Sequence, residues 1–231
     1  MTRPAACLID VYETILSCDF SRHSRELPAL AGVTPQDWRA GTSRLGPLFN
    51  VGRLTKTEGF GQVLRECGVE PRADLVRALL EADRELLLAS AHLYDDSLPF
   101  LSELRSHGVR TAIVSNCSEH TRELLVKLGV PELVDAVVLS CEVGAAKPSA
   151  EIFRHALDQL GVQAGAALFV DDQAAFCAGA VAVGISAAQI IRDGTHGAGR
   201  VRAAGRVDGT APTAGTTVVR SLPEVGAMLW T

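Results

Sequence analysis

Four short apolar runs, each followed directly by polar residues, constrain the fold of this chain more than any other feature of its sequence. The runs are Ala-Ala-Cys-Leu-Ile at 5–9, Thr-Ala-Ile-Val at 111–114, Ala-Val-Val-Leu at 136–139 and Ala-Ala-Leu-Phe-Val at 166–170. A continuous apolar run of this length is typical of a parallel strand that is buried on both faces. Amphipathic helical patterns lie between the later runs, as at 151–161. Strands alternating with helices predict an α/β fold with a doubly wound, Rossmann-like parallel sheet.

The residues between the first two runs follow a different pattern. Residues 17–94 carry helical patterns without an intervening strand, and Thr34, Pro35 and Asp37 open one of them in the order expected of a helix start. No linker-like composition separates this part from the rest. We therefore predict an α/β core formed by residues 1–16 and 95–231, with residues 17–94 inserted as a helical unit.

The C-terminal part adds two expected strands and one long connection. Residues 188–191 and 217–219 predict a fifth and a sixth strand, and a short helix is expected near 222–229. The residues between these strands, 193–216, are rich in Gly, Ala and Thr and include three arginines. A loop of this length is uncommon unless it is mobile or functional. We predict a mobile loop that begins on the side of the sheet where the site lies.

Charge and cysteine usage exclude several classes of protein. The chain has 22 Lys and Arg against 27 Asp and Glu, a net charge of −5, whereas binding to nucleic-acid phosphates or an anionic membrane favours a basic surplus. No apolar run approaches the roughly 18 residues that would span a bilayer, and the start lacks the pattern of a signal peptide, so a cytoplasmic location is expected. The six cysteines form no C-x-x-C pair, which predicts reduced, mostly buried thiols.

Polar residues that follow the predicted strands define a candidate site. In an open parallel sheet, ligands bind beyond the carboxyl ends of the strands. The residues brought there are Asp10, Ser115, Asn116, Lys147, Asp171 and Asp172. Carboxylates supply the oxygen ligands that Mg²⁺ prefers, and a lysine can pair with a phosphate or a carboxylate. Each residue alone is also explained by a helix cap or a solvated turn, but the whole set favours phosphoryl chemistry.

The same residues carry a family resemblance that extends over nearly the full length. The first motif is Asp10-Val11-Tyr12-Glu13-Thr14, the second is Val114-Ser115-Asn116, the third centres on Lys147-Pro148, and the fourth is Phe169-Val170-Asp171-Asp172. In this order and spacing they resemble the four motifs of the haloacid dehalogenase (HAD) superfamily of hydrolases. The insertion at 17–94 then resembles the cap domain that closes over the site in that superfamily.

The resemblance implies a role for each site residue. Asp10 is the expected nucleophile, which forms an aspartyl intermediate, and Ser115 and Lys147 are the expected catalytic partners that orient the transferred group and the nucleophile. The implied cofactor is Mg²⁺, held by Asp10, the Tyr12 carbonyl, Asp171 and Asp172. The residues expected to face a small-molecule substrate are Tyr12, Glu13 and Asn116. In the cap, further candidate contacts are Trp38, Arg39, Arg44, Phe49, Asn50 and Arg53, although helix packing and solvated charge also explain them.

Two departures from the family pattern leave the reaction open. Most phosphatases of the superfamily have an aspartate two residues after the nucleophile, whereas this chain has Tyr12, as dehalogenases do, and Glu13 stands where a glycine is usual. The fourth motif is phosphatase-like, because dehalogenases lack the acidic pair Asp171-Asp172. We favour a Mg²⁺-dependent phosphatase-type hydrolase, because three clustered carboxylates repel one another without a cation. The alternatives are a metal-independent 2-haloacid dehalogenase and a degenerate member that only binds a ligand or partner. The sequence predicts neither the substrate nor the oligomeric state.

Overall fold

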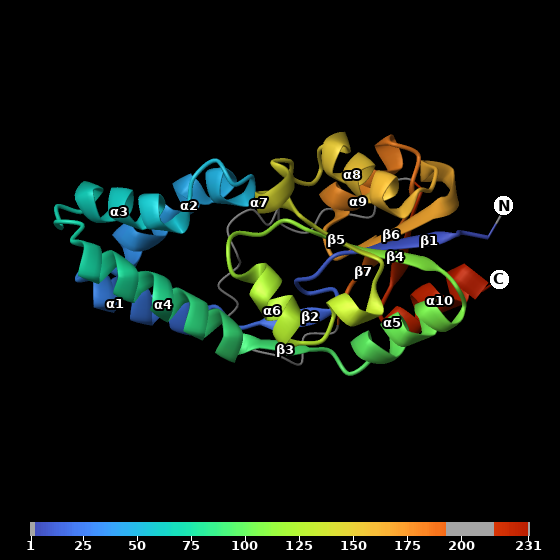
Figure 1. Cartoon of the computed structure of the whole chain (residues 1–231), viewed down its shortest axis with the longest axis horizontal. Coiled ribbons are helices and arrows are strands. Elements are labelled where there is room, and N and C mark those ends of the chain that lie inside the picture. The colour runs from blue at the N-terminus through green and yellow to red at the C-terminus, as the bar shows by residue number, and fades with distance from the viewer. Residues whose placement is uncertain (1–2, 193–214, 231) are drawn as a thin grey trace.

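The core is a six-stranded sheet in which every neighbouring pair of strands is parallel (Figure 1). The computed structural model describes residues 3–192 and 215–230. The strands, in spatial order, are β5 (Ala136–Leu139), β4 (Arg110–Ser115), β1 (Ala6–Ile9), β6 (Ala167–Asp171), β7 (Ser186–Ile190) and β8 (Thr216–Val219). All six strands lie within about two residues of the expected positions, and the prediction of a parallel α/β fold is confirmed.

Helices cover both faces of the sheet, which explains why the strands are apolar on both sides. One face packs against α8 (Ala150–Leu160) and α9 (Ala174–Ala182), and the other against α5 (Ser97–Ser106), α6 (Thr121–Lys127) and α10 (Leu222–Trp230) (Figure 1). Alternate residues of β1 pack against opposite helical layers. Leu8 packs on the side of α8 and α9, whereas Cys7 and Ile9 pack on the side of α5, α6 and α10. Short helical turns, α7 (Ser140–Val143), Pro131–Leu133 and Ala164–Ala166, complete the connections.

The insertion forms its own helical layer at one end of the molecule. It consists of α1 (Ser21–Ala31), α2 (Pro35–Asn50), α3 (Lys56–Glu66) and α4 (Ala73–Ser90), which lie at the left in Figure 1. The helices share a separate apolar core that includes Leu27, Trp38, Phe60, Leu64 and Leu79. As expected, α2 begins with Thr34 as its cap, whose side chain accepts a hydrogen bond from the Asp37 N–H. We call this layer the cap.

The expectation that the insertion contains no strand is wrong. Strands β2 (Leu16–Cys18) and β3 (Ala91–Leu93) pair antiparallel where the chain enters and leaves the cap, with Leu16 opposite Leu93. Each strand has only three residues, which is too short to show an alternating pattern, and its partner lies more than 70 residues away. Local periodicity therefore cannot reveal this pair.

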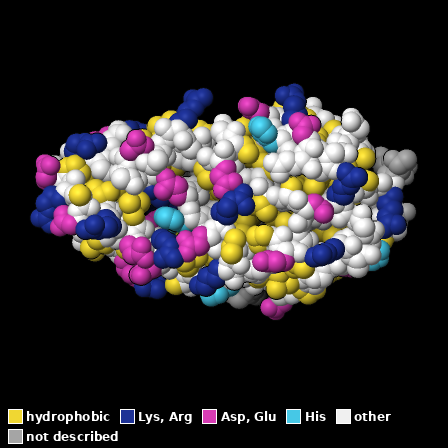
Figure 2. Space-filling model, viewed as in Figure 1, with side chains coloured by type: hydrophobic (Ala, Val, Ile, Leu, Met, Phe, Trp, Pro, Cys, Tyr) yellow, Lys and Arg dark blue, Asp and Glu magenta, His cyan; other side chains and the backbone are white. Residues whose placement is uncertain are grey.

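Three other expectations concern the chain as a whole. The six cysteines are free thiols, and Cys7, Cys117 and Cys177 are buried. In the described ranges, none of the helices combines the length and the apolar character needed to cross a bilayer. On the face in Figure 2, acidic and basic side chains are interspersed.

Nearly all of the predicted mobile loop, 193–216, lies outside the described residues; its last residue, Thr216, begins β8.

Candidate active site

The topology of the sheet brings three separate segments together at one crevice. Strand β1 lies between β4 and β6. The next two strands of this sheet along the chain, β4 and β5, lie on one side of β1 and the later strands lie on the other, so a crevice is expected at the carboxyl ends of these strands. The register places Ile9 beside Ile113 and Val170, so the residues that follow these strands are neighbours. The Asp10 N–H donates to the Val170 carbonyl at 2.9 Å, which fixes the start of the loop after β1.

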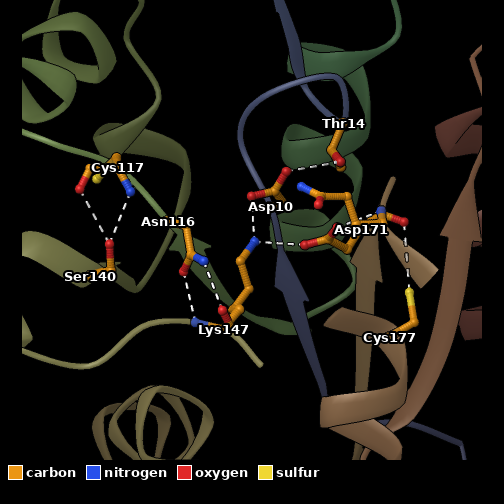
Figure 3. Close-up of polar contacts among 9 residues, drawn as sticks. Asp10, Thr14, Asn116, Cys117, Ser140, Lys147, Asp171 and Cys177 are labelled. Atoms are coloured by element: carbon orange, nitrogen blue, oxygen red, sulfur yellow. Dashed lines mark hydrogen bonds and ion pairs between the residues drawn. The ribbon is translucent and has the colours of Figure 1, made fainter. Parts of the chain in front are cut away.

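Lys147 joins two carboxylates of this crevice (Figure 3). Its Nζ lies 2.5 Å from Asp10 Oδ1 and 2.6 Å from Asp171 Oδ2, and its side chain is only 1% exposed. Burial alone lowers the pKa of the Lys147 ammonium, but the two carboxylates outweigh burial and hold that pKa above its ordinary value. The lysine is therefore charged, and it orients Asp10 through a charge-assisted hydrogen bond.

Asn116 fixes the backbone of Lys147. Its Nδ2 donates to the Lys147 carbonyl at 2.8 Å, and its Oδ1 accepts from the Lys147 N–H at 2.7 Å, as Figure 3 shows. Sequence reasoning assigned Asn116 to the substrate, and the structure adds this second contact, which fixes the backbone of the lysine that pairs with Asp10. Thr14, to which the sequence assigned no role beyond its place in the first motif, donates from Oγ1 to Asp10 Oδ2 at 3.3 Å.

Ser115 ends β4 with a side chain that is fully buried. Its Oγ has no hydrogen-bond partner among the residues described. A buried hydroxyl without a partner costs free energy, so such groups usually meet a ligand or an ordered water. Ser115 is therefore placed to hydrogen-bond a group that enters the crevice.

Three carboxylates converge closely enough to hold a metal ion. Oxygens of Asp10, Asp171 and Asp172 lie within 4.8 Å of one another. Their formal charges and that of Lys147 sum to −2, and burial raises the pKa of Asp171 because its charged form is poorly solvated. A hard divalent cation that prefers oxygen ligands fits this donor set in both charge and chemistry. Mg²⁺ is such a cation, and the loop that begins at Asp10 also carries the Tyr12 carbonyl.

The two unusual residues of the first motif have separate partners. The Tyr12 hydroxyl lies 3.0 Å from Thr121 Oγ1, and burial raises the pKa of Tyr12 above its ordinary value, so the phenol stays protonated at neutral pH. Glu13 has φ +61°, the left-handed conformation that favours the glycine usual at this position. Its Oε2 accepts a hydrogen bond from Tyr94 OH at 3.0 Å, where the chain returns from the cap. Glu13 does not line the cavity described next.

A cavity of about 550 Å³ lies between the cap and the crevice. Its floor includes Tyr12 and Asn116, and most of its walls come from α1, α2 and α3 of the cap. Of the cap residues considered from the sequence, Trp38, Arg39, Phe49 and Asn50 line the cavity. Arg44 instead pairs with Glu66 on the surface. Sequence reasoning missed Phe20, His23, Lys56 and Asp83, which also line the cavity, because their positions depend on how the cap folds over the core.

Fold and site together define a family. The model of the haloacid dehalogenase-like hydrolases matches residues 4–184, which is more than half of the chain. The chain belongs to the haloacid dehalogenase-like hydrolases, as the four motifs indicated.

Particular relatives include both phosphatases and dehalogenases. Glyceraldehyde 3-phosphate phosphatase from Methanopyrus kandleri is 34% identical over 49% of this chain and 49% of its own length, so the chain spans about half of that relative. (S)-2-haloacid dehalogenase 4A from Burkholderia cepacia is 27% identical over 82% of this chain and 84% of its own length. A solved HAD phosphatase from Thermococcus onnurineus has the same fold, with a TM-score of 0.63 and 24% identity over 97% of both chains.

Proposed function

We propose that this chain is a Mg²⁺-dependent phosphohydrolase that acts on a small activated metabolite through an aspartyl phosphate at Asp10. The observation that carries the proposal is the convergence of Asp10, Asp171 and Asp172 against one ammonium, that of Lys147. The phosphatase name of the Methanopyrus kandleri relative supports the same type of reaction. The cytoplasmic location expected from the sequence stays a prediction.

In this mechanism the residues of the crevice prepare one oxygen of Asp10 for attack. Lys147 and Thr14 orient the carboxylate through a hydrogen bond to each of its two oxygens. The buried Ser115 hydroxyl donates to an oxygen of the phosphoryl group. Asp10, Asp171 and Asp172 would hold Mg²⁺, which would supply positive charge to offset the charge of the phosphoryl oxygens. Asp10 attacks phosphorus, the leaving group departs, and water then releases phosphate and restores the carboxylate.

Tyr12 sets a limit on the leaving group. A general acid typically contributes about 10² to 10⁴ in rate, and it works best when its pKa lies near the working pH. The pKa of Tyr12 lies above its ordinary value, so this phenol is a poor proton donor at pH 7. We therefore expect substrates whose leaving group is stable as an anion, such as acyl or aryl phosphates.

A metal titration tests this proposal. Chelator-treated protein should not hydrolyse 4-nitrophenyl phosphate, and added Mg²⁺ should restore turnover. Asp172→Asn should raise the Mg²⁺ concentration needed for half-maximal rate by about 10-fold or more. The reason is that a carboxylate that binds a metal, or that hydrogen-bonds one of its ligands, strongly affects the metal affinity. Asp158→Asn, an exposed carboxylate on α8, is the matched control and should leave the titration unchanged. Full turnover in the presence of chelator would contradict the metal assignment.

A metal-independent 2-haloacid dehalogenase is the second candidate. Tyr12 favours it, because a halide leaves without a proton, and so does the similarity to the Burkholderia cepacia dehalogenase over 82% of the chain. Turnover of 2-chloropropionate in the presence of chelator, without turnover of any phosphate ester, would establish this candidate instead. Turnover of neither substrate class, together with binding of a ligand, would favour a degenerate binding protein.

A further inference from the structure

The cavity beneath the cap is separate from the residues that perform the proposed transfer. Asp10, Lys147 and Asp171 do not line it, whereas Tyr12 and Asn116, which neighbour the nucleophile and Ser115 in sequence, form its floor. A substrate that reacts at Asp10 can therefore place its phosphoryl group in the crevice and its leaving group in the cavity. The volume of about 550 Å³ lies in the range of pockets that enclose drug-sized ligands, so a two- or three-carbon leaving group would leave most of it unfilled.

Aromatic rings from both domains surround this space. Tyr12 of the core packs against Phe20 with ring centroids 6.3 Å apart, and Phe20 packs against His23 at 5.1 Å. A second pair, Trp38 and Phe60, has centroids 5.1 Å apart and lines the same cavity. The rings of each pair contact one another, and because all of them also line the cavity, an aromatic ligand there can stack on them or meet them edge to face.

Polar atoms in the cap walls of the cavity add a second requirement. Lys56 and Asp83 form an ion pair there, with side chains only 13% and 8% exposed. His23 is 9% exposed, and its Nδ1 has no hydrogen-bond partner among residues 3–192 and 215–230. Burial lowers the pKa of His23, so the ring is neutral at pH 7 and Nδ1 can donate or accept. Because Lys56, Asp83 and His23 all line the cavity, a ligand with a hydrogen-bonding substituent can pair with this polar part of the wall.

We infer that the substrate is a phosphate monoester of a phenol whose aromatic ring carries a hydrogen-bonding substituent. This inference rests on the proposed function and names its substrate class. A carboxylate oxygen of Asp10 forms the new bond to phosphorus, the bond from phosphorus to the phenolic oxygen breaks, and its electron pair leaves on the phenolate. A phenol has a pKa of about 10. An aliphatic alcohol is a much weaker acid, with a pKa comparable with that of water, about 16. A phenolate is therefore a better leaving group than an alkoxide.

A substrate panel with two cap variants tests the inference. The panel is 4-hydroxyphenyl phosphate, phenyl phosphate and acetyl phosphate, which has no ring. We expect kcat/KM for 4-hydroxyphenyl phosphate to exceed that for acetyl phosphate, and Ser43→Phe, which puts a ring into the cavity wall, to lower this ratio by about 10-fold or more. Ser102→Phe, at an exposed position on α5, is the matched control. His23→Phe keeps the ring beside Phe20 and should reduce the preference for 4-hydroxyphenyl over phenyl phosphate by about 10-fold.

A binding measurement separates failure of the inference from failure of the proposed function. 2-Naphthol is titrated into Asp10→Asn protein, with the fluorescence of Trp38 as the readout and Trp38→Phe to identify that signal. Quenching in Asp10→Asn that Ser43→Phe removes supports the aromatic site. Turnover of acetyl phosphate without preference for aryl phosphates and without naphthol binding overturns the inference and leaves the proposed function intact. Naphthol binding without turnover of any phosphate ester overturns the proposed function and keeps the aromatic site.

Discussion

Replacing Tyr12 with aspartate should convert a hydrolase restricted to good leaving groups into one that also cleaves alkyl phosphates. The new carboxyl group would stand two residues after Asp10, at the floor of the cavity where the leaving group is expected. Burial and the nearby charge of Asp10 would both raise the pKa of this carboxyl group, which favours its protonated form. A protonated carboxyl group at this place can donate to a departing alkoxide.

The expected gain in rate follows from the general acid that is added, and the expected loss of stability follows from the contacts that are removed. A positioned general acid adds about 10² to 10⁴ in rate, which corresponds to about 3 to 5 kcal/mol of transition-state stabilisation. The substitution removes the hydrogen bond to Thr121 and the ring contact with Phe20, at a cost of about 2 kcal/mol in stability. A domain with ordinary stability of about 5 to 15 kcal/mol stays folded after such a loss.

The assay compares kcat/KM for glycerol phosphate and acetyl phosphate in the wild type, Tyr12→Asp and Tyr12→Asn. The asparagine variant has the same shape and loses the same contacts, so the difference between the two variants isolates the proton. We expect glycerol phosphate turnover to rise in the aspartate variant alone, with little change for acetyl phosphate. An equal rise in both variants, or a wild type that already cleaves both substrates at similar rates, would refute the reasoning.

Three further predictions concern residues at the site and in the cap. Lys147→Met leaves buried carboxylates without their counter-charge and should lower the free energy of unfolding by about 3–5 kcal/mol, measured by urea denaturation; an unchanged midpoint would contradict it. Gly179→Ala places a Cβ 2.7 Å from the Pro148 carbonyl and should cost about 1–3 kcal/mol and reduce kcat, whereas Gly165→Ala, with open space around it, should do neither. Burial lowers the pKa of His23 in the folded protein, so the unfolded chain binds more protons than the folded chain as pH falls below about 6.5, and the melting temperature falls. Melting curves of His23→Phe should show a smaller fall over the same pH range.

The fold could be predicted because its signals are local. Four of the six core strands, β1, β4, β5 and β6, are apolar runs followed by polar residues, and helix starts such as Thr34 carry their own capping pattern. The pair β2–β3 could not be predicted, because three-residue strands carry almost no pattern and their pairing closes a loop of more than 70 residues. Pairing at this distance depends on how the whole cap folds.

The candidate site could likewise be predicted only in part. Asp10, Ser115 and Asp171 could be brought together from the sequence, because each follows a strand and parallel strands end at one edge of the sheet. The hydrogen bonds that position the site could not be predicted. The two between Asn116 and the Lys147 backbone, for example, join loops that lie 31 residues apart in the chain. The aromatic cavity depends on packing between cap and core, which residue periodicity does not encode.

Rapid acid quenching during the first turnover tests the central claim most directly. The protein is mixed with Mg²⁺ and an excess of 4-nitrophenyl phosphate, quenched, digested and examined by mass spectrometry. The account predicts a phosphoryl group on the peptide that contains Asp10, absent from Asp10→Asn protein and from samples without Mg²⁺. A peptide that stays unmodified while a burst of 4-nitrophenol is released, or a phosphoryl group on a different residue, would contradict it.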